Sequence, residues 1–274
     1  MMDFWIHILN FFDLQMEKPE PYGWFHLSFF AFFIALTVLF AVLHRGKQKH
    51  VRFMLLFVSI LVILLEVYKQ INYSFTVSDG VIEFDYQWYA FPFQFCSTPM
   101  YVGLLAGILG KGKLHDCLCA YLATYAIFAG AAVMFYPTTI FIGTIGINIQ
   151  SLICHDSMIF LGVYLYATGH VKLRHKTILR ALPIFIVMVL IAATGNEIAH
   201  LSGLLETEDL NLFFISPYCE PHLPVYSSVQ ALVPFPFCLI IYILGFTGAA
   251  YVILLMAMLI GWLVTRKKKK AELV

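Results

Sequence analysis

The segment VRFMLLFVSILVILLEVYKQI, residues 51–71, is long enough and apolar enough to cross a lipid bilayer as one helix. A bilayer core of about 30 Å needs about 20 such residues in an α-helix. Three polar side chains, Glu66, Lys69 and Gln70, gather in the last two turns of the segment. Charged groups are costly in hydrocarbon, so we expect these to face protein or a wet cavity. The segment therefore predicts a membrane helix with one polar end.

The whole chain has the composition of a membrane protein. Of its 274 residues, 61% are hydrophobic and 12% are charged, whereas soluble domains are about half apolar and about a quarter charged. We predict an all-α polytopic membrane protein with seven transmembrane helices, in segments 24–43, 51–71, 91–109, 115–135, 149–168, 177–198 and 236–264. The last segment exceeds the length of one span, so we expect it to tilt or to begin as a re-entrant piece.

The basic residues divide unevenly between alternate connections. Fifteen of the 17 Lys and Arg residues fall in segments 44–52, 110–114, 169–180 and 265–274. The positive-inside rule places these segments in the cytoplasm. We therefore predict an exoplasmic N-terminus and a cytoplasmic C-terminus. The expected parts are an exoplasmic interfacial segment, a seven-helix membrane domain and a basic cytoplasmic tail, which cover residues 1–23, 24–264 and 265–274.

Polar side chains concentrate near the exoplasmic ends of four predicted helices. They are Glu66, Gln70, Tyr73, Gln94, Thr98, Gln150, His155, Asp156, Asn196, Glu197 and His200. Side chains that are this costly in lipid face the interior of a bundle or a wet cavity. The rest of the membrane depth holds few such groups apart from His115 and Asp116. The pattern predicts one polar pocket that opens outward.

Cys96 and His155 could act together as nucleophile and base. Each lies about six residues into a helix that enters from the exoplasmic side, so their side chains have similar depth. The thiolate would attack an ester carbonyl and hold the acyl group as a thioester. Donors for the oxyanion would come from Gln94, Thr98, Asn196 or Asn211. A carboxylate from another helix would orient the imidazole, and the candidates are Glu66 and Glu197.

Other interpretations of these residues stay open. A cysteine in a membrane helix is more often structural, which is how we interpret Cys117, Cys119, Cys154 and Cys238. An outward polar pocket is also half of the pathway of a transporter or permease for small molecules or lipids. The sparse polar groups elsewhere in the membrane disfavour that function. A seven-helix receptor and a purely structural role are further alternatives. Gly103, Gly107 and Gly110 form a small-residue face that predicts close helix packing.

The motifs that are missing also restrict the function. The sequence has no C-x-x-C pair, no H-E-x-x-H motif and no glycine-rich phosphate loop. It therefore predicts no metal site and no cofactor. The expected partners are the lipid bilayer and a phospholipid or lysophospholipid substrate. Nothing in the sequence indicates a nucleic acid or a protein partner.

Five short stretches resemble, in the same order, motifs of the YwaF-like family of bacterial integral membrane proteins. PFQFCS (92–97) resembles the family motif LPLxLCS. Pro137 matches a proline at the exit of a helix, and INIQSLICHDSMIF (147–160) matches a helix that carries a His. NLFFISP (211–217) resembles the family element NYMFL…P, and PHLPVY (221–226) resembles a Pro-containing run before the last helix. The resemblance covers roughly residues 85–260.

The resemblance implies a function and its residues. Eukaryotic relatives of the YwaF-like family include a TMEM-type transmembrane acyltransferase that transfers acyl chains to ether lysophospholipids through a membrane Cys. Intramembrane Thr/His lipid-ester hydrolases are more distant relatives. The family's Cys, His and Asn fall on Cys96, His155 and Asn211. Two positions depart from the pattern, because Asp156 stands where the family more often has Gly and Leu212 where it has Tyr. A Cys-dependent phospholipid acyltransferase or transacylase is implied, in a bacterial plasma membrane or a eukaryotic endomembrane.

Overall fold

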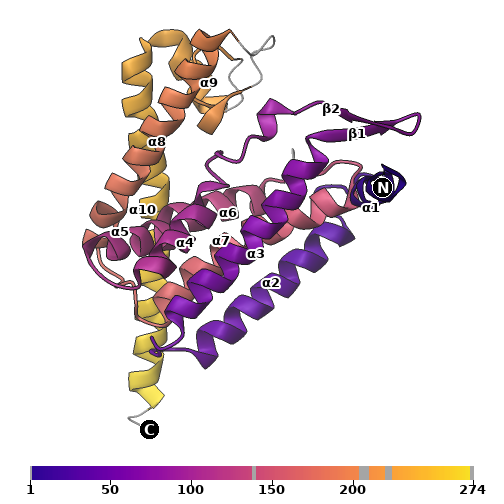
Figure 1. The fold of residues 1–274 in the computed structure, drawn as a ribbon. Coiled ribbons are helices and arrows are strands. Elements are labelled where there is room, and N and C mark those ends of the chain that lie inside the picture. Colours follow the sequence, from indigo (N-terminus) through magenta and orange to yellow (C-terminus); the bar gives the residue numbers. More distant parts are fainter. Residues whose placement is uncertain (1, 138–139, 204–209, 220–223, 272–274) are drawn as a thin grey trace.

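The computed structural model describes residues 2–137, 140–203, 210–219 and 224–271, and it is predominantly helical (Figure 1). Residues 221–223 and 272–274, which belong to the predicted PHLPVY motif and basic tail, lie outside this described part. The elements in chain order are α1 Met2–Phe12, α2 Trp24–Leu43, α3 Val51–Asn72, β1 Phe75–Ser78, β2 Val81–Phe84, η1 Trp88–Ala90, α4 Thr98–Leu109, α5 Lys113–Tyr121, η2 Leu122–Ala126, α6 Ile127–Phe135, α7 Ile145–Ala167, α8 Lys176–Ser202, η3 Leu212–Phe214, α9 Pro224–Leu232 and α10 Phe235–Ala271.

Five helical stretches of the described residues are long and apolar enough to cross a membrane. They are α2, α3, the continuous unit α5–η2–α6, α8 and the part of α10 up to Val264. Each overlaps one of the seven predicted segments. Helix α7 occupies the fifth predicted segment, 149–168, but it carries Asn148, Gln150, His155 and Asp156 and is not among the five apolar helices. The chain is therefore an α-helical, multi-pass protein, with five spans supported by length and composition.

The prediction of a helix over 91–109 was wrong in its first third. Helix α4 begins at Thr98 and has 12 residues, while residues 91–94 are irregular and residues 95–97 form a turn. Pro99 lies in the first turn of α4, where its missing N–H leaves no intrahelical bond unmade. The proline at the start of this helix is therefore Pro99. The residues before it are free to follow an irregular path towards the segment around η3.

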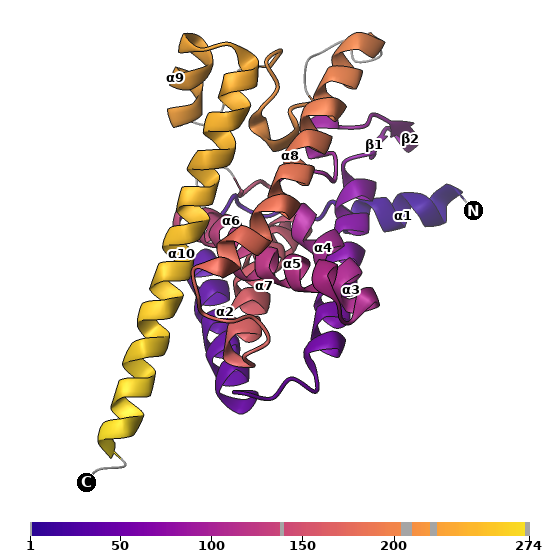
Figure 2. The same cartoon turned by 90° about the vertical axis from the view of Figure 1, so that its left-hand side faces the viewer.

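The helices do not lie at one level. Helices α4, α5 and α6 occupy the centre, with α2, α3 and α7 packed on one side and α8 and α10 on another (Figures 1 and 2). Helix α8 and the first part of α10 rise together beyond the ends of α2 and α3 (Figure 2). The core lies between these groups, where the fully buried ring of Tyr125 stacks on Phe185 with centroids 4.4 Å apart.

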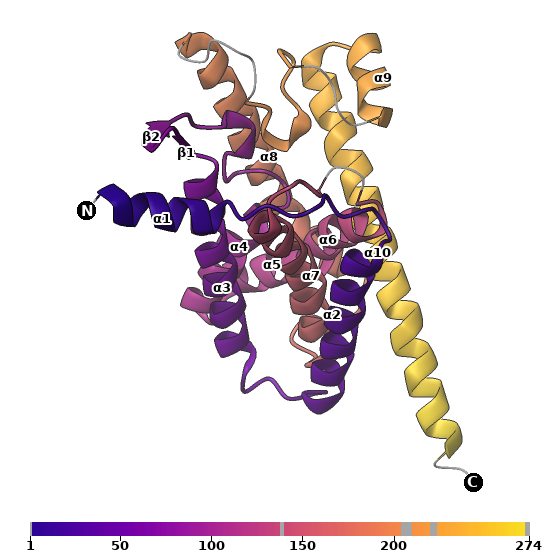
Figure 3. The same cartoon turned by 90° about the vertical axis from the view of Figure 1, so that its right-hand side faces the viewer.

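The connections between helices meet at two opposite ends. At one end, the amide of Gly46 donates to the carbonyl of Ala167 over 2.9 Å, which joins the α2–α3 and α7–α8 connections. At the other end, Gln15 and Thr144 form a bridge between the α1–α2 and α6–α7 connections. Helix α1 lies across the C-terminal end of α3, where the Tyr68 hydroxyl donates to the Phe12 carbonyl over 2.7 Å (Figure 3). Two of the predicted basic connections are thus neighbours in space.

Glycines allow the central helices to approach closely. In α4, a Cβ on Gly103 or Gly107 would clash with Ser59 or Leu56 of α3, which confirms the predicted small-residue packing at these two positions. Gly110 instead ends the helix as its C-cap, with a φ angle of 68°. In α6, a Cβ on Gly130 would overlap the backbone carbonyl of His155 in α7. A backbone atom cannot rotate away as a side-chain terminus can. The contact therefore fixes the position of α7 relative to the core.

We predict opposite effects of the same substitution at two helical glycines. Gly130→Ala should lower stability by about 1–3 kcal/mol, because α6 and α7 must separate. Gly245→Ala in α10, where nothing lies within 4 Å of the added Cβ, should be neutral or raise stability by up to about 1 kcal/mol through helix propensity. Thermal unfolding of both variants in the same detergent measures the difference. Equal melting temperatures for the two variants would contradict the packing argument.

Candidate functional site

Cys96 lies in a turn directly before helix α4. The Gln94 carbonyl accepts hydrogen bonds from the amides of Ser97 at 2.9 Å and Thr98 at 3.1 Å, which closes the turn. The thiol is partly buried, and it stands next to the N-cap residue Ser97. The positive end of the helix dipole favours an anion at such a position. Burial of the thiol opposes this effect, because desolvation disfavours the charged form. The irregular start of α4 therefore places Cys96 at the N-terminal end of the helix.

The immediate surroundings of Cys96 form a small cavity of about 10 Å³. Its lining includes Cys154 and Ser157 of α7 and Met100 of α4. The Cys154 thiol lies 3.9 Å from the Cys96 carbonyl oxygen as a weak donor. No sequence motif pairs these two cysteines, because 58 residues separate them. The cavity places α7 beside Cys96, as the predicted Cys–His pairing requires.

His155 lies on the same helix as Cys154 and is buried. Its Nδ1 lies 2.7 Å from the Ser151 carbonyl oxygen. In the neutral imidazole Nδ1 therefore carries the proton, and Nε2 holds the lone pair that a base needs. Among the hydrogen bonds of the described residues, none joins this ring to Cys96. The next residue, Asp156, is buried with an Oδ2 atom that has no partner within the described chain.

A buried polar network surrounds Glu66. Its carboxylate contacts the Lys69 ammonium at 2.8 Å and accepts a hydrogen bond from Gln70 Nε2 at 2.8 Å. Gln150 Nε2 on α7 donates to the other carboxylate oxygen over 3.3 Å. The Tyr86 hydroxyl donates to Gln70 Oε1 over 2.7 Å, and burial, followed by the charge of Glu66, raises the pKa of Tyr86. The predicted polar end of α3 is thus a hydrogen-bonded network, and Tyr86 belongs to it although no sequence pattern indicated that residue.

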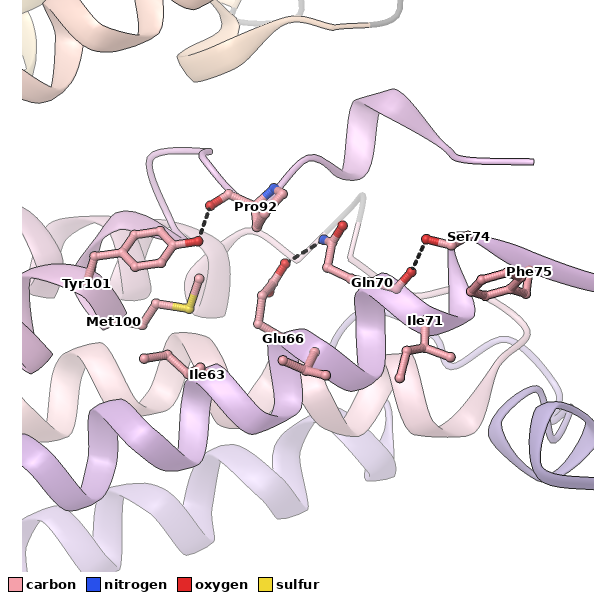
Figure 4. Close-up of a pocket in the computed structure, with 10 residues that line it drawn as sticks. Ile63, Glu66, Gln70, Ile71, Ser74, Phe75, Pro92, Met100 and Tyr101 are labelled. Carbon is pink, nitrogen blue, oxygen red and sulfur yellow. Dashed lines mark hydrogen bonds between the residues drawn. The ribbon is translucent and has the colours of Figure 1, made fainter. Parts of the chain in front are cut away.

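A cavity of about 280 Å³ opens beside this network. Figure 4 shows Glu66 and Gln70 directed from α3 towards Pro92, with Met100 and Tyr101 of α4 on another side. The other lining residues are apolar except for Ser74. They are Ile63, Val67, Ile71, Ser74 and Phe75. Met100 lines both this cavity and the small one at Cys96. The apolar space with one polar side and the small cavity at the thiol therefore share Met100 as a wall.

Two amide side chains hold the irregular segment around η3. Gln94 donates to the Asn211 carbonyl over 3.1 Å and accepts from the Phe213 amide over 3.0 Å. Asn196 of α8 likewise makes two bonds with the backbone of Leu212, at 3.1 and 2.8 Å. These two predicted oxyanion donors therefore serve first to satisfy backbone groups.

The held segment is strained and contains one free donor. Phe213 and Phe214 have φ angles of 57° and 56°, in the left-handed region that large side chains rarely adopt. The Tyr242 hydroxyl of α10 fixes the Phe213 carbonyl over 3.0 Å. Asn211 Oδ1 accepts from the Ser216 amide over 3.0 Å, whereas its buried Nδ2 has no partner within the described residues. Asn211 is the predicted donor that keeps an unused N–H group.

The remaining predicted residues do not join one pocket. Glu197 accepts a hydrogen bond from the Tyr218 hydroxyl over 2.7 Å, and His200 stacks on the Tyr218 ring at 3.5 Å. The bond to Glu197 raises the pKa of Tyr218. Hydrogen bonds join this group to the Asn211 segment, because the Tyr218 amide donates to Ser216 Oγ over 3.3 Å and the Ser216 amide donates to Asn211 Oδ1. Among the described residues, none joins it to the Glu66 network. Thr98 instead contacts the Tyr121 hydroxyl at 2.9 Å, and Tyr73 packs edge-on against Tyr89.

Comparisons with known proteins agree with a membrane protein and identify its family. Neither the curated proteins nor the solved structures contain a match to the chain. The sequence model of the TMEM164 family matches residues 21–261. This range includes four of the five apolar membrane helices, most of the fifth and every residue of the candidate site, and it is most of the chain. The protein therefore belongs to the TMEM164 family.

Proposed function

We propose that the protein is a membrane-embedded lipid acyltransferase or acyl-ester hydrolase that uses Cys96 as nucleophile and His155 as base. The observation that carries this proposal is the apolar cavity of about 280 Å³ next to the turn that presents Cys96. Such a space suits the acyl chain of a phospholipid or lysophospholipid. The similarity of Cys96, His155 and Asn211 to the motif residues of YwaF-like proteins and of their acyltransferase relatives supports the same chemistry.

The proposed reaction has two steps. His155 Nε2 takes the proton of the Cys96 thiol, and the thiolate attacks the carbonyl carbon of the lipid ester. Collapse of the tetrahedral intermediate breaks the ester C–O bond, and His155 returns the proton to the leaving alkoxide. The resulting thioester is then attacked by the hydroxyl of an acceptor lipid, or by water in a hydrolase, while His155 takes the proton of that hydroxyl. The C–S bond breaks, and His155 returns the proton to the Cys96 thiolate. Cys96 and His155 must approach in the substrate complex, as catalytic hydrogen bonds commonly do.

Asn211 is the proposed oxyanion donor. Its Nδ2 is buried and unpartnered, while its Oδ1 is held by the Ser216 amide. A donor that is fixed before the reaction stabilises developing charge without reorganisation. Gln94 and Asn196 support it indirectly, because they hold the backbone on either side of Leu212. Asn211 therefore contacts the reacting oxygen in this mechanism, and the other two amides position it.

The proposed topology keeps seven membrane helices, with α4 and α7 added to the five apolar ones. The N-terminus is exoplasmic and the basic C-terminal tail is cytoplasmic, so Cys96 faces the exoplasmic leaflet. The meeting of the α2–α3 and α7–α8 connections supports this arrangement, because both are rich in Lys and Arg. Helix α4 has 12 residues and is too short to cross the bilayer by itself. In the proposed topology, the irregular residues 91–97 complete this crossing.

We predict that Cys96 alone among the cavity cysteines forms an acyl-enzyme. Full-length protein in detergent is incubated with a phospholipid whose acyl chain carries an alkyne label. The wild type and the control variant Cys154→Ser should retain label that neutral hydroxylamine removes, and Cys96→Ser should not. His155→Ala should label more slowly by about 10²–10⁴-fold, because the general base is lost. Hydroxylamine-sensitive labelling of Cys96→Ser at the wild-type rate would rule out this nucleophile.

We predict that Asn211 and Asn196 differ in what they contribute. Asn211→Ala should slow acylation by about 10²–10³-fold through loss of the oxyanion donor. Asn196→Ala should lower stability by about 1–3 kcal/mol, because backbone groups of Leu212 lose their partners, and it should slow acylation less per folded molecule. Labelling rates are measured together with thermal unfolding. If acylation in both variants falls only in proportion to the folded fraction, Asn211 is not a catalytic donor.

A further inference from the structure

A second cluster of reactive side chains lies where α5 meets the α7–α8 connection. It consists of His115 and Cys119 on α5 and His170 in the connection. Their potential ligand atoms all lie within 4.8 Å of one another, and the first two residues are buried. The residues of the proposed acylation site take no part in it. The sequence showed no reason to join them, because His170 is 55 residues from His115.

The geometry of His115 directs a lone pair into this cluster. Its Nδ1 lies 2.9 Å from the Ala106 carbonyl oxygen, so Nδ1 carries the proton of the neutral ring. Its Nε2 lies 2.7 Å from His170 Nε2 and 3.5 Å from Cys119 Sγ. A hydrogen bond from the second ring nitrogen to a backbone carbonyl is the usual way in which a metal-ligating His is oriented. Two imidazole nitrogens and a thiol therefore converge on one point.

We propose that His115, Cys119 and His170 bind a zinc ion. Zn–N bonds of about 2.0–2.1 Å and a Zn–S bond of about 2.3 Å in tetrahedral geometry separate the ligand atoms by about 3.3–3.6 Å. Cys119 and His115 already have this spacing. The Nε2 atoms of His115 and His170 lie at a distance that suits an N–H···N hydrogen bond. They must move apart by about 0.6 Å to bind the same zinc ion. Binding releases the thiol proton of Cys119, and His170 carries its remaining proton on Nδ1.

The fourth position of the ion is assigned to a water molecule. A cavity of about 40 Å³ adjoins Cys119 and His170, which exceeds the roughly 10–15 Å³ that one water requires. Its charged lining residues are Asp116, Lys172, Arg174 and Arg180, and Arg180 lies 3.7 Å from the Asp116 carboxylate. The cations oppose the charge of a metal ion, and the thiolate that Cys119 becomes on binding offsets part of that charge. The ion would tie the α7–α8 connection to α5.

Metal content and a cobalt spectrum test this site in the full-length protein. Protein purified in detergent is stripped with a chelator, given zinc, passed through a desalting column and measured by mass spectrometry of the metal. The wild type should hold about one zinc per chain, and Cys119→Ser and His170→Ala should each lose most of it. Cys117→Ser is the matched control, because Cys117 is partly buried on the same helix and is outside the cluster. It should bind zinc as the wild type does.

Cobalt substitution reports the ligand directly. With Co²⁺ in place of zinc, the wild type and Cys117→Ser should show a thiolate-to-metal charge-transfer band and the intense visible bands of four-coordinate cobalt. The charge-transfer band should be absent from Cys119→Ser. Size-exclusion profiles identify any variant that has lost its fold. If Cys119→Ser is such a variant, His170→Ala provides the test, because this residue lies in a connection and not in a helix. Equal zinc content in all variants, or no zinc in the wild type after loading, would overturn the proposal.

Discussion

Gln94 makes two hydrogen bonds on which the candidate site depends. They join residues 91–97, before α4, to residues 211–216, before α9, although 117 residues separate Gln94 from Asn211. Both segments are irregular and pass among apolar helices. In such surroundings every backbone N–H and carbonyl group needs a partner within the protein. The Gln94 amide supplies one donor and one acceptor to the second segment, and Asn196 repeats this arrangement from α8.

The irregular path has a chemical consequence. A continuous helix through Cys96 would turn its thiol to one side among other helical side chains. The turn that ends at Ser97 instead presents it at the beginning of α4, next to cavities that α3 and α7 also line. The same segments hold strained residues, and the strain at Phe213 and Phe214 persists because side chains from three elements fix the backbone. Strain maintained in this way is characteristic of functional sites.

The two proposed sites differ in the source of their order. The acylation site is organised by hydrogen bonds between side-chain amides and backbone groups. The zinc site would be organised by a metal ion that links an α5 helix turn to the next connection. His115 belongs to the few polar groups that the sequence places away from the polar ends of the helices. Its contacts with Ala106 and His170 give that exception a physical reason.

Local patterns in the sequence determined much of the architecture. Hydropathy located the five apolar membrane helices, helical spacing placed Glu66, Lys69 and Gln70 on one face, and small residues marked the packing of α4 on α3. These properties depend on neighbours within a few turns of one helix. The sequence did not determine where α4 begins, that the polar residues form separate networks, or that His115, Cys119 and His170 meet. Those outcomes depend on which distant backbone groups each side chain must satisfy, and only the tertiary structure brings the partners together.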